Sequence, residues 1–438
     1  MAISARRRTV PAKAVVFPFV PDRPFEFALI VAATFSMLNA SAGIIGALSI
    51  AGGAVLLSLM RRDVTGQALK WWPLFGFCLL QVLTTVWSLD RGVTIRYSLQ
   101  LLLTAYVGVF AILARRPTDL IRAIVIGGLA AVALSLVSGV KGHFSATGET
   151  LVGLMGSKNA MSYTAGLVAQ ACLALLVLRV SFLWKALGLV GFLVCFAVAV
   201  SVHAAMGTIS AALGVLLFPT LWVASRLPKS WRDVLVALVV LFSVMGGLIW
   251  LQIGNQITAM VLGALHKDPG LTGRAQLWAF AHQFIQARPI LGRGYKEVWV
   301  GQSVDTIGLL RWAGLTDGRT FYFHQTYIEA TVDSGYIGVT LLILTYIAIA
   351  YGFVRKFIAG MSDGVQFFFI MFLLLMLRSF TETLMQPFGQ TVFIVYAAGV
   401  AAWADMPRAV KASPRPRDRS RWSRLQNGFS RADWPARA

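Results

Sequence analysis

The sequence has little charge and few cysteines for its length. Only 13% of its 438 residues are charged whereas 57% are apolar, and this balance excludes the ordinary soluble class. The three cysteines, Cys78, Cys172 and Cys195, all fall inside apolar runs, where a thiol packs as a small apolar group. We therefore expect no disulfide framework. The composition instead indicates a polytopic membrane protein.

The sequence also lacks clusters of potential metal ligands. No set of Cys and His residues has the spacing of a zinc site, and no acidic cluster resembles a magnesium site. We therefore expect neither a metal nor another cofactor.

Apolar segments long enough to cross about 30 Å of hydrocarbon recur along the chain. They predict an all-α, polytopic integral membrane protein of about twelve transmembrane helices. The expected spans are 25–41, 43–60, 71–89, 94–114, 120–139, 159–179, 184–202, 206–225, 232–253, 336–354, 365–383 and 388–405.

The distribution of Lys and Arg predicts the orientation of these spans. The net charge of +21 could indicate nucleic acid as a partner, but most cations flank apolar runs on alternate sides. Under the positive-inside rule both termini are cytoplasmic, and membrane lipids rather than nucleic acid are the expected partner of this charge. Residues 1–24 are basic and interrupted by prolines without a cleavage site, so we expect a retained first span rather than a signal peptide. The Arg- and Pro-rich tail 406–438 is expected to be disordered near anionic head groups.

One long segment, 254–335, is neither apolar enough to cross the membrane nor part of the basic ends. The orientation rule makes it a large periplasmic loop between the ninth and tenth spans. Positive charge on that side runs against the rule and needs another reason. The cations concerned are Lys267, Arg274, Arg288, Arg293, Lys296, Arg311 and Arg319.

Local signals predict two helices in this loop. Thr272 is placed to cap a helix that starts near Gly273 and ends at Pro289. A turn at Gly292–Gly294 follows, and a second short helix is expected from His324 to Asp333, leading into the next span. A helix lying in the membrane plane would place its polar residues at head-group level.

Several short motifs lie on the outer-side segments. They are Thr272-Gly273-Arg274 with Trp278, Gly292-x-Gly294-Tyr295, His324-Gln325 followed after nine residues by Gly335-x-x-Gly338, Gly156-Ser157-Lys158-Asn159, and Arg378 with Glu382. Together they resemble the O-antigen ligase and Wzy-type polymerase superfamily, most closely the exopolysaccharide polymerases of the ExoQ type. The resemblance covers most of the chain between about 70 and 400.

The resemblance implies a GT-C-like fold and transfer of a glycan from an undecaprenyl-diphosphate carrier without a metal, at the outer face of the bacterial inner membrane. Displacing the diphosphate requires stabilising negative charge, which Arg and Lys can do. His324 would then act as general base and Arg274 as the main diphosphate ligand. The residues implied in substrate binding are Arg288, Arg293, Lys158, Arg378 and Glu382.

Each of these residues also has a plainer interpretation. His324 could bond a carbonyl at the interface, Arg274 could contact head groups, and Arg378 with Glu382 could form a salt bridge one helical turn apart. Arg288 and Arg293 could be solvated turn residues. His266 and His282 of the same loop and His143 of a shorter one belong to no motif and are expected to be surface residues.

Three functions are compatible with these motifs. The first hypothesis is polymerisation of undecaprenyl-diphosphate-linked oligosaccharide repeat units into exopolysaccharide. The second is ligation of a lipid-linked glycan to lipid A core or a protein, but many such ligases carry Arg in a segment where this chain has His203. The third is a transporter or flippase of lipid-linked glycans, which would place functional charge at the bilayer midplane, whereas here it lies on one side. A chain-length regulating co-polymerase remains open as a further partner.

Overall fold

The computed structural model describes residues 23–38, 43–144, 148–264, 274–314 and 321–405. Several residues of the sequence motifs lie outside these ranges. They are His266, Lys267, Thr272, Gly273, Arg319 and the two basic ends, 1–22 and 406–438.

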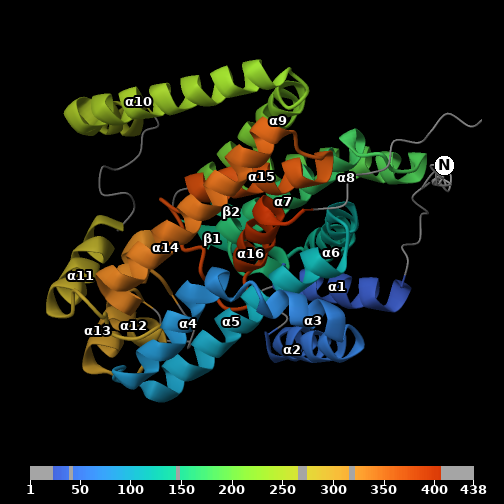
Figure 1. Ribbon diagram of the computed structural model, residues 1–438. Helices are drawn as coiled ribbons and strands as arrows, with labels where there is room; N and C mark the ends of the chain where they lie inside the picture. Colours follow the sequence, from blue (N-terminus) through green and yellow to red (C-terminus); the bar gives the residue numbers. More distant parts are fainter. Residues whose placement is uncertain (1–22, 39–42, 145–147, 265–273, 315–320, 406–438) are drawn as a thin grey trace, which may run out of the picture. The chain divides into compact units, whose positions relative to one another are not determined.

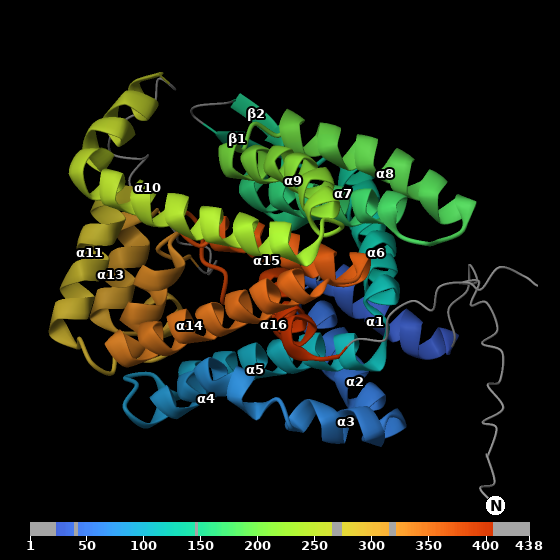
Figure 2. The same ribbon diagram turned by 45° about the horizontal axis from the view of Figure 1, so that its top comes forward.

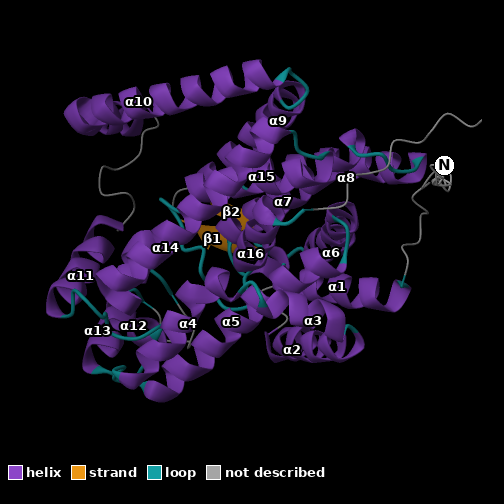
Figure 3. Ribbon diagram, viewed as in Figure 1, coloured by secondary structure: helices purple, strands orange, loops and turns teal. Residues whose placement is uncertain are grey.

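Apart from one short hairpin, the regular secondary structure of the described residues is helical, with loops between the helices (Figure 3). Strand β1 (Lys141–Phe144) pairs antiparallel with β2 (Gly148–Leu151), with Lys141 opposite Leu151. The predicted all-α class is thus confirmed for the membrane part, and the hairpin is a small outlying addition that the sequence reading missed.

The helices are labelled in Figure 1 and Figure 2. Up to the hairpin they are α1 (Pro24–Met37), α2 (Gly43–Met60), α3 (Arg62–Leu69), the 3-10 helix η2 (Trp72–Phe75), α4 (Gly76–Leu83), η3 (Thr84–Val86), α5 (Arg91–Ala114) and α6 (Pro117–Ser138). After the hairpin follow η4 (Gly153–Met155), α7 (Lys158–Val177), α8 (Phe182–Ser201), α9 (Ala205–Ala224), α10 (Lys229–Ala264), α11 (Arg274–Ala287), α12 (Glu297–Val300), α13 (Val304–Trp312), α14 (Thr326–Ala359), α15 (Asp363–Arg378) and α16 (Gln390–Trp403).

Within the described part, eight helices are long and apolar enough to cross a membrane. A ninth candidate is the bent pair Arg62–Leu69 and Trp72–Val86, whose halves meet at 65°. The expected count of twelve is not shown, because four of the expected segments form helices that are short or interrupted. Segments 25–41, 365–383 and 388–405 became α1, α15 and α16, and segment 71–89 is divided among η2, α4 and η3.

Small residues let the central helices approach closely. A Cβ added at Gly108 on α5 would lie 2.5 Å from the carbonyl oxygen of Phe393 on α16. A Cβ at Gly128 on α6 would lie 2.2 Å from a methyl of Val168 on α7. Helices in lipid associate through such close packing, since lipid removes the hydrophobic driving force between them. These contacts hold α5 against α16 and α6 against α7.

Helix α10 differs from the central helices. It is 36 residues long, and its most apolar window, within Lys229–Gly254, has no buried residue, whereas the window of α7 is 78% buried. Long apolar surface without protein cover is what contact with lipid requires.

The segment between α10 and α14 has a small hydrophobic core of its own. Helices α11, α12 and α13 pack around this core, and α11 also contacts α14 (Figure 2). The core residues are Leu277, Ala281, Val298, Trp299, Leu309, Phe323 and Val332. The predicted helix ending before Pro289 is confirmed as α11.

The second predicted helix of this segment is partly wrong. It begins at Thr326 rather than His324, because the side chain of Gln325 caps it by accepting a hydrogen bond from the Ile328 amide. It continues into the span, but the helical backbone is broken at Ser334 and Gly335. His324 lies outside the helix with a φ of 53°.

Candidate functional site

The two glycine motifs of the sequence form one backbone unit. The amides of Arg293 and Gly294 donate to the carbonyls of Val332 and Asp333, both at 2.9 Å, and the Tyr336 amide donates to the Pro289 carbonyl at 2.8 Å. These bonds join the turn after α11 to the break in α14. The backbone groups that the break in α14 leaves without helical partners are thus hydrogen-bonded to the turn after α11.

Glycine is required on both sides of this junction. Gly335 has a φ of 66°, and a Cβ there would lie 2.1 Å from the Ile290 carbonyl oxygen. A Cβ at Gly292, whose φ is 68°, would lie 2.5 Å from the Ser334 amide nitrogen. Left-handed backbone and the lack of space both favour glycine here. The motifs therefore hold α11 and α14 in a fixed relation.

Hydrogen bonds of the preceding residue, Phe323, help to fix the position of the motif histidine. The indole nitrogen of Trp278 donates to the carbonyl of Phe323 at 2.9 Å, and the Phe323 amide donates to Glu329 at 2.7 Å. The ring of His324 packs against those of Phe321 and Tyr322, with centroids 5.0 and 4.5 Å away. A non-glycine residue at positive φ costs energy and persists where its surroundings hold it.

The carboxylate of Glu382 is the centre of the site. Its Oε2 lies 3.1 Å from Nδ1 of His324, while its Oε1 accepts from Arg274 Nη2 at 3.3 Å and from Asn159 Nδ2 at 3.2 Å. Arg274 also donates to the Thr381 carbonyl at 2.9 Å. One buried carboxylate thus gathers groups from α7, α11 and the segment before α14.

The backbone around this carboxylate is fixed by Thr326. Its hydroxyl donates to the Glu382 carbonyl at 2.7 Å and accepts from the Leu384 amide at 3.0 Å. The Thr326 amide donates to the Ser379 carbonyl at 2.9 Å. The start of α14 and the segment after α15 are therefore locked together, which positions His324 against Glu382.

Electrostatics keep Glu382 ionised. Burial alone would raise the pKa of this carboxyl, but the His324 hydrogen bond and the charges of Arg378, His324 and Arg274 lower the pKa below its ordinary value. An ionised carboxylate only accepts hydrogen bonds, so Nδ1 of the imidazole is the donor. In the neutral ring Nε2 is then left as an acceptor. Burial and the nearby Glu382 charge raise the pKa of Tyr322 to about 12, so its phenol stays protonated.

The salt bridge between Arg378 and Glu382, the plainer interpretation of these two residues, is not formed. Helix α15 ends at Arg378. The Glu382 amide still donates to the Arg378 carbonyl at 2.9 Å, but the Glu382 carboxylate contacts Arg274 and His324 instead. The Arg378 guanidinium lies 3.4 Å from the centroid of the Tyr163 ring on α7, a cation–π contact. The positive charge of Arg378 still lowers the pKa of the Glu382 carboxyl.

Lys158 lies beside this group. It is the first residue of α7, whose N-cap is Ser157, and it immediately precedes the Asn159 that donates to Glu382. The Gly-Ser-Lys-Asn motif is thus brought next to the histidine motif.

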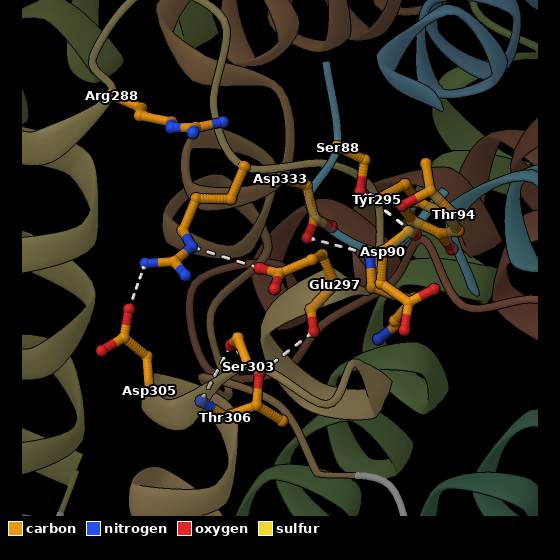
Figure 4. Close-up of polar contacts among 12 residues, drawn as sticks. Ser88, Asp90, Thr94, Arg288, Tyr295, Glu297, Ser303, Asp305, Thr306 and Asp333 are labelled. Carbon is orange, nitrogen blue, oxygen red and sulfur yellow. Dashed lines mark hydrogen bonds and ion pairs between the residues drawn. The ribbon is translucent and has the colours of Figure 1, made fainter. Parts of the chain in front are cut away.

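Arg293 lies away from Glu382. It is buried and pairs with Glu297 at 3.1 Å and with Asp305 at 2.8 Å (Figure 4). These contacts tie the turn after α11 to α12 and α13. In the structure this guanidinium therefore stabilises the packing of α12 and α13 against the turn after α11.

Arg288 also lies away from Glu382, on an exposed surface, where it donates to the Trp87 carbonyl at 3.2 Å. The other described histidines are separate as well. His203 is exposed between α8 and α9 with a φ of 53°, His143 lies in β1, and His282 of α11 contacts Gln286 at 2.9 Å.

The sequence reading missed two residues of the site. Asn159 belonged to a quoted motif but was given no role, although an amide next to a cation in a short motif is a usable signal. Tyr163 had no sequence signal, because a tyrosine within an apolar run most often serves packing.

Comparison with known proteins agrees with this geometry. Residues 190–343 match the model of a protein family described as O-antigen ligase. The matched residues include Arg274 and His324. Over 344 residues, or 76% of this chain and 78% of the relative, it is 28% identical to "Exopolysaccharide production protein ExoQ" of Rhizobium meliloti (strain 1021).

These matches confirm the resemblance drawn from the motifs. The O-antigen ligase family implies a membrane glycosyltransferase that uses a lipid-linked glycan. The chain is a multi-pass membrane protein with eight or nine candidate spans among its described residues.

Proposed function

We propose that the protein polymerises undecaprenyl-diphosphate-linked repeat units into exopolysaccharide. The observation that carries this proposal is Glu382, which holds Nδ1 of His324 and a guanidinium nitrogen of Arg274 on its two oxygens. A base and a phosphate ligand are thereby placed side by side.

The chemistry follows from these two groups. Nε2 of His324 takes the proton of the acceptor hydroxyl as its oxygen forms a bond to the anomeric carbon of the donor. The bond between that carbon and the diphosphate oxygen breaks, and the electron pair leaves with the undecaprenyl diphosphate. Arg274 and Arg378 stabilise the charge that develops on the leaving group. The proton on His324 is then released to solvent or to the diphosphate.

In this proposal the guanidinium groups replace a divalent cation. Two cations near the leaving oxygen supply charge of the size that Mg²⁺ supplies in other phosphate chemistry. Among the described residues, no three His, Cys, Asp or Glu side chains are grouped so as to hold a metal. The reaction is therefore proposed to need no added metal.

The reaction is proposed to take place on the periplasmic face of the bacterial inner membrane, with both chain ends in the cytoplasm. The charge distribution along the sequence supports this orientation. The site residues come from the start of α7, the start of α11, the segment before α14 and the segment after α15. An active site at this level would meet the lipid head groups.

A ligase is the second candidate, since the matched family is described as O-antigen ligase. The likeness to an exopolysaccharide production protein favours the polymerase. The lipid-linked glycans of a strain deleted for the gene separate the two. Single repeat units accumulate if a polymerase is missing, and long lipid-linked chains accumulate if a ligase is missing. Loss of all lipid-linked glycan from the outer face would indicate a flippase instead.

A further inference from the structure

Arg288 lies at the opposite end of α11 from Arg274. Helix α11 runs from Arg274 to Ala287, so the two cations are separated by about 20 Å of helix. Arg274 contacts Glu382, whereas Arg288 contacts none of the residues around His324. The two guanidinium groups therefore serve different places on the molecule.

Arg288 has no carboxylate partner within the described ranges. It is exposed, and its one side-chain hydrogen bond goes to the Trp87 carbonyl. The neighbouring Arg293 is by contrast paired with Glu297 and Asp305, and Figure 4 shows Arg288 apart from both of these carboxylates. The carboxylate of Asp90, three residues after Trp87, caps α5 by accepting from the Val93 amide. Arg288 thus keeps its charge available for an external anion.

The segments that meet near this cation carry exposed apolar side chains. The Trp87 indole donates to the Leu291 carbonyl at 2.9 Å, and the Ile337 amide approaches the Ile290 carbonyl at 3.4 Å, so three distant segments meet here. We call the resulting patch the Arg288 surface. It consists of Arg288, Leu89, Ile290, Leu291, Tyr336 and Ile337, and its apolar members are 43 to 62% exposed.

The composition of the Arg288 surface fits a lipid phosphate. A guanidinium binds two phosphate oxygens at once, and an apolar rim accepts the adjoining hydrocarbon. Tyr336 and Ile337 are the first residues after the break in α14, at the start of the apolar part of this candidate span. An anionic lipid head with an apolar tail is the ligand that matches both parts.

We propose that the Arg288 surface binds the diphosphate of the second, acceptor lipid-linked glycan. This inference rests on the proposed polymerase function, in which the incoming repeat unit is itself attached to a lipid diphosphate. That unit reacts at its non-reducing end, so its diphosphate must lie one oligosaccharide away from the donor's diphosphate. The separation of Arg274 and Arg288 along α11 meets this requirement.

The test is the number of undecaprenyl diphosphate molecules bound by the whole protein in phosphatidylcholine nanodiscs. The wild type is expected to bind two, and Arg288→Gln and Arg274→Gln one each, with the lost site weakened about tenfold or more. Arg311→Gln, a change at an exposed residue of the same segment, should leave two. An unchanged count in Arg288→Gln would overturn the proposal.

Two further arms identify the ligand and guard against misfolding. Discs containing phosphatidylglycerol should keep the Arg288-dependent site occupied by undecaprenyl diphosphate, and its displacement would mean that the surface holds ordinary phospholipid. Ile290→Ser keeps Arg288 but removes apolar surface, so it should weaken the same site; normal affinity would contradict the apolar rim. If Arg274→Gln still binds two while Arg288→Gln binds one, the proposed donor site fails and the Arg288 surface stands.

Discussion

Nδ1 of His324 lies 3.1 Å from Oε2 of Glu382, although 58 residues separate them in the sequence. The contact orients the imidazole and directs its Nε2 away from the carboxylate. It makes Glu382 a positioning residue for His324 as well as a partner of Arg274.

The first prediction concerns this pair. His324→Ala should lower turnover by about 10²–10⁴-fold while donor binding changes little. Glu382→Gln should lower turnover by about 10–100-fold, the value of a lost charge-assisted hydrogen bond. The loss in the double variant should be smaller than the product of the two single losses, because Glu382 acts on turnover in part through the imidazole. Single-turnover rates in nanodiscs measure this, with His282→Ala as control; additive losses would assign Glu382 an independent role.

The second prediction concerns the donor's leaving group. Arg274→Ala should weaken binding of the lipid-linked donor as well as turnover, and Arg274→Lys should recover only part, because an ammonium cannot make a bidentate contact. Donor affinity and single-turnover rate are measured for each variant at matched membrane levels, with Arg311→Ala as control. Donor affinity that stays at the wild-type value in Arg274→Ala would place the diphosphate elsewhere.

The third prediction concerns the junction between α11 and α14. Gly335→Ala places a side chain at a φ of 66° and 2.1 Å from the Ile290 carbonyl, so it should destabilise the fold by more than about 1–3 kcal/mol. Gly246→Ala on α10, where no atom lies within 4 Å, is the control and should be neutral or slightly stabilising. Thermal unfolding in detergent compares the two, and equal midpoints would refute the role given to the break.

The fourth prediction concerns orientation. Val304 on α13 is 86% exposed, and the three native cysteines are buried, so a Val304→Cys variant gives a site-specific label over a low background. A membrane-impermeant thiol reagent should label it in intact spheroplasts. Labelling only after lysis would place the segment in the cytoplasm and invert the proposed topology.

The fifth prediction concerns metal. The purified protein should polymerise its lipid-linked substrate at nearly the untreated rate in EDTA, because Arg274 and Arg378 carry the charge that a divalent ion would supply. A large loss that Mg²⁺ or Mn²⁺ restores would show that the guanidinium groups do not suffice.

The sequence was informative about residues and less so about their partners. His324, Arg274, Lys158 and Glu382 were all selected from motifs, and the structure brings them, or in the case of Lys158 its neighbour Asn159, to one place. The spacing of Arg378 and Glu382 allows a salt bridge within one helical turn, and that turn is formed, but the carboxylate pairs with His324 and Arg274. Such a pairing depends on segments far apart in the chain, which spacing within one segment cannot reveal.

The same contrast holds for the fold: the sequence predicts the long helices but not how separate segments meet. Apolar length located the long spans α5 to α9, but it merged short and broken helices into full spans, as at 71–89. The glycines at 292 and 335 were recognised as motif residues. Their mutual backbone contact could not be inferred, since it depends on how two segments meet.

The length of α10 has a consequence for how the protein sits in lipid. Its candidate span, Lys229–Gly254, has 26 residues and is about 39 Å long, which exceeds about 30 Å of hydrocarbon. Such a helix has to tilt, and the tilt required changes with bilayer thickness. Since the most apolar window of this span has no buried residue, few contacts with the rest of the protein oppose that change. The chain reaches Arg274, the proposed diphosphate ligand, ten residues after α10 ends, so we expect the activity to depend on membrane thickness.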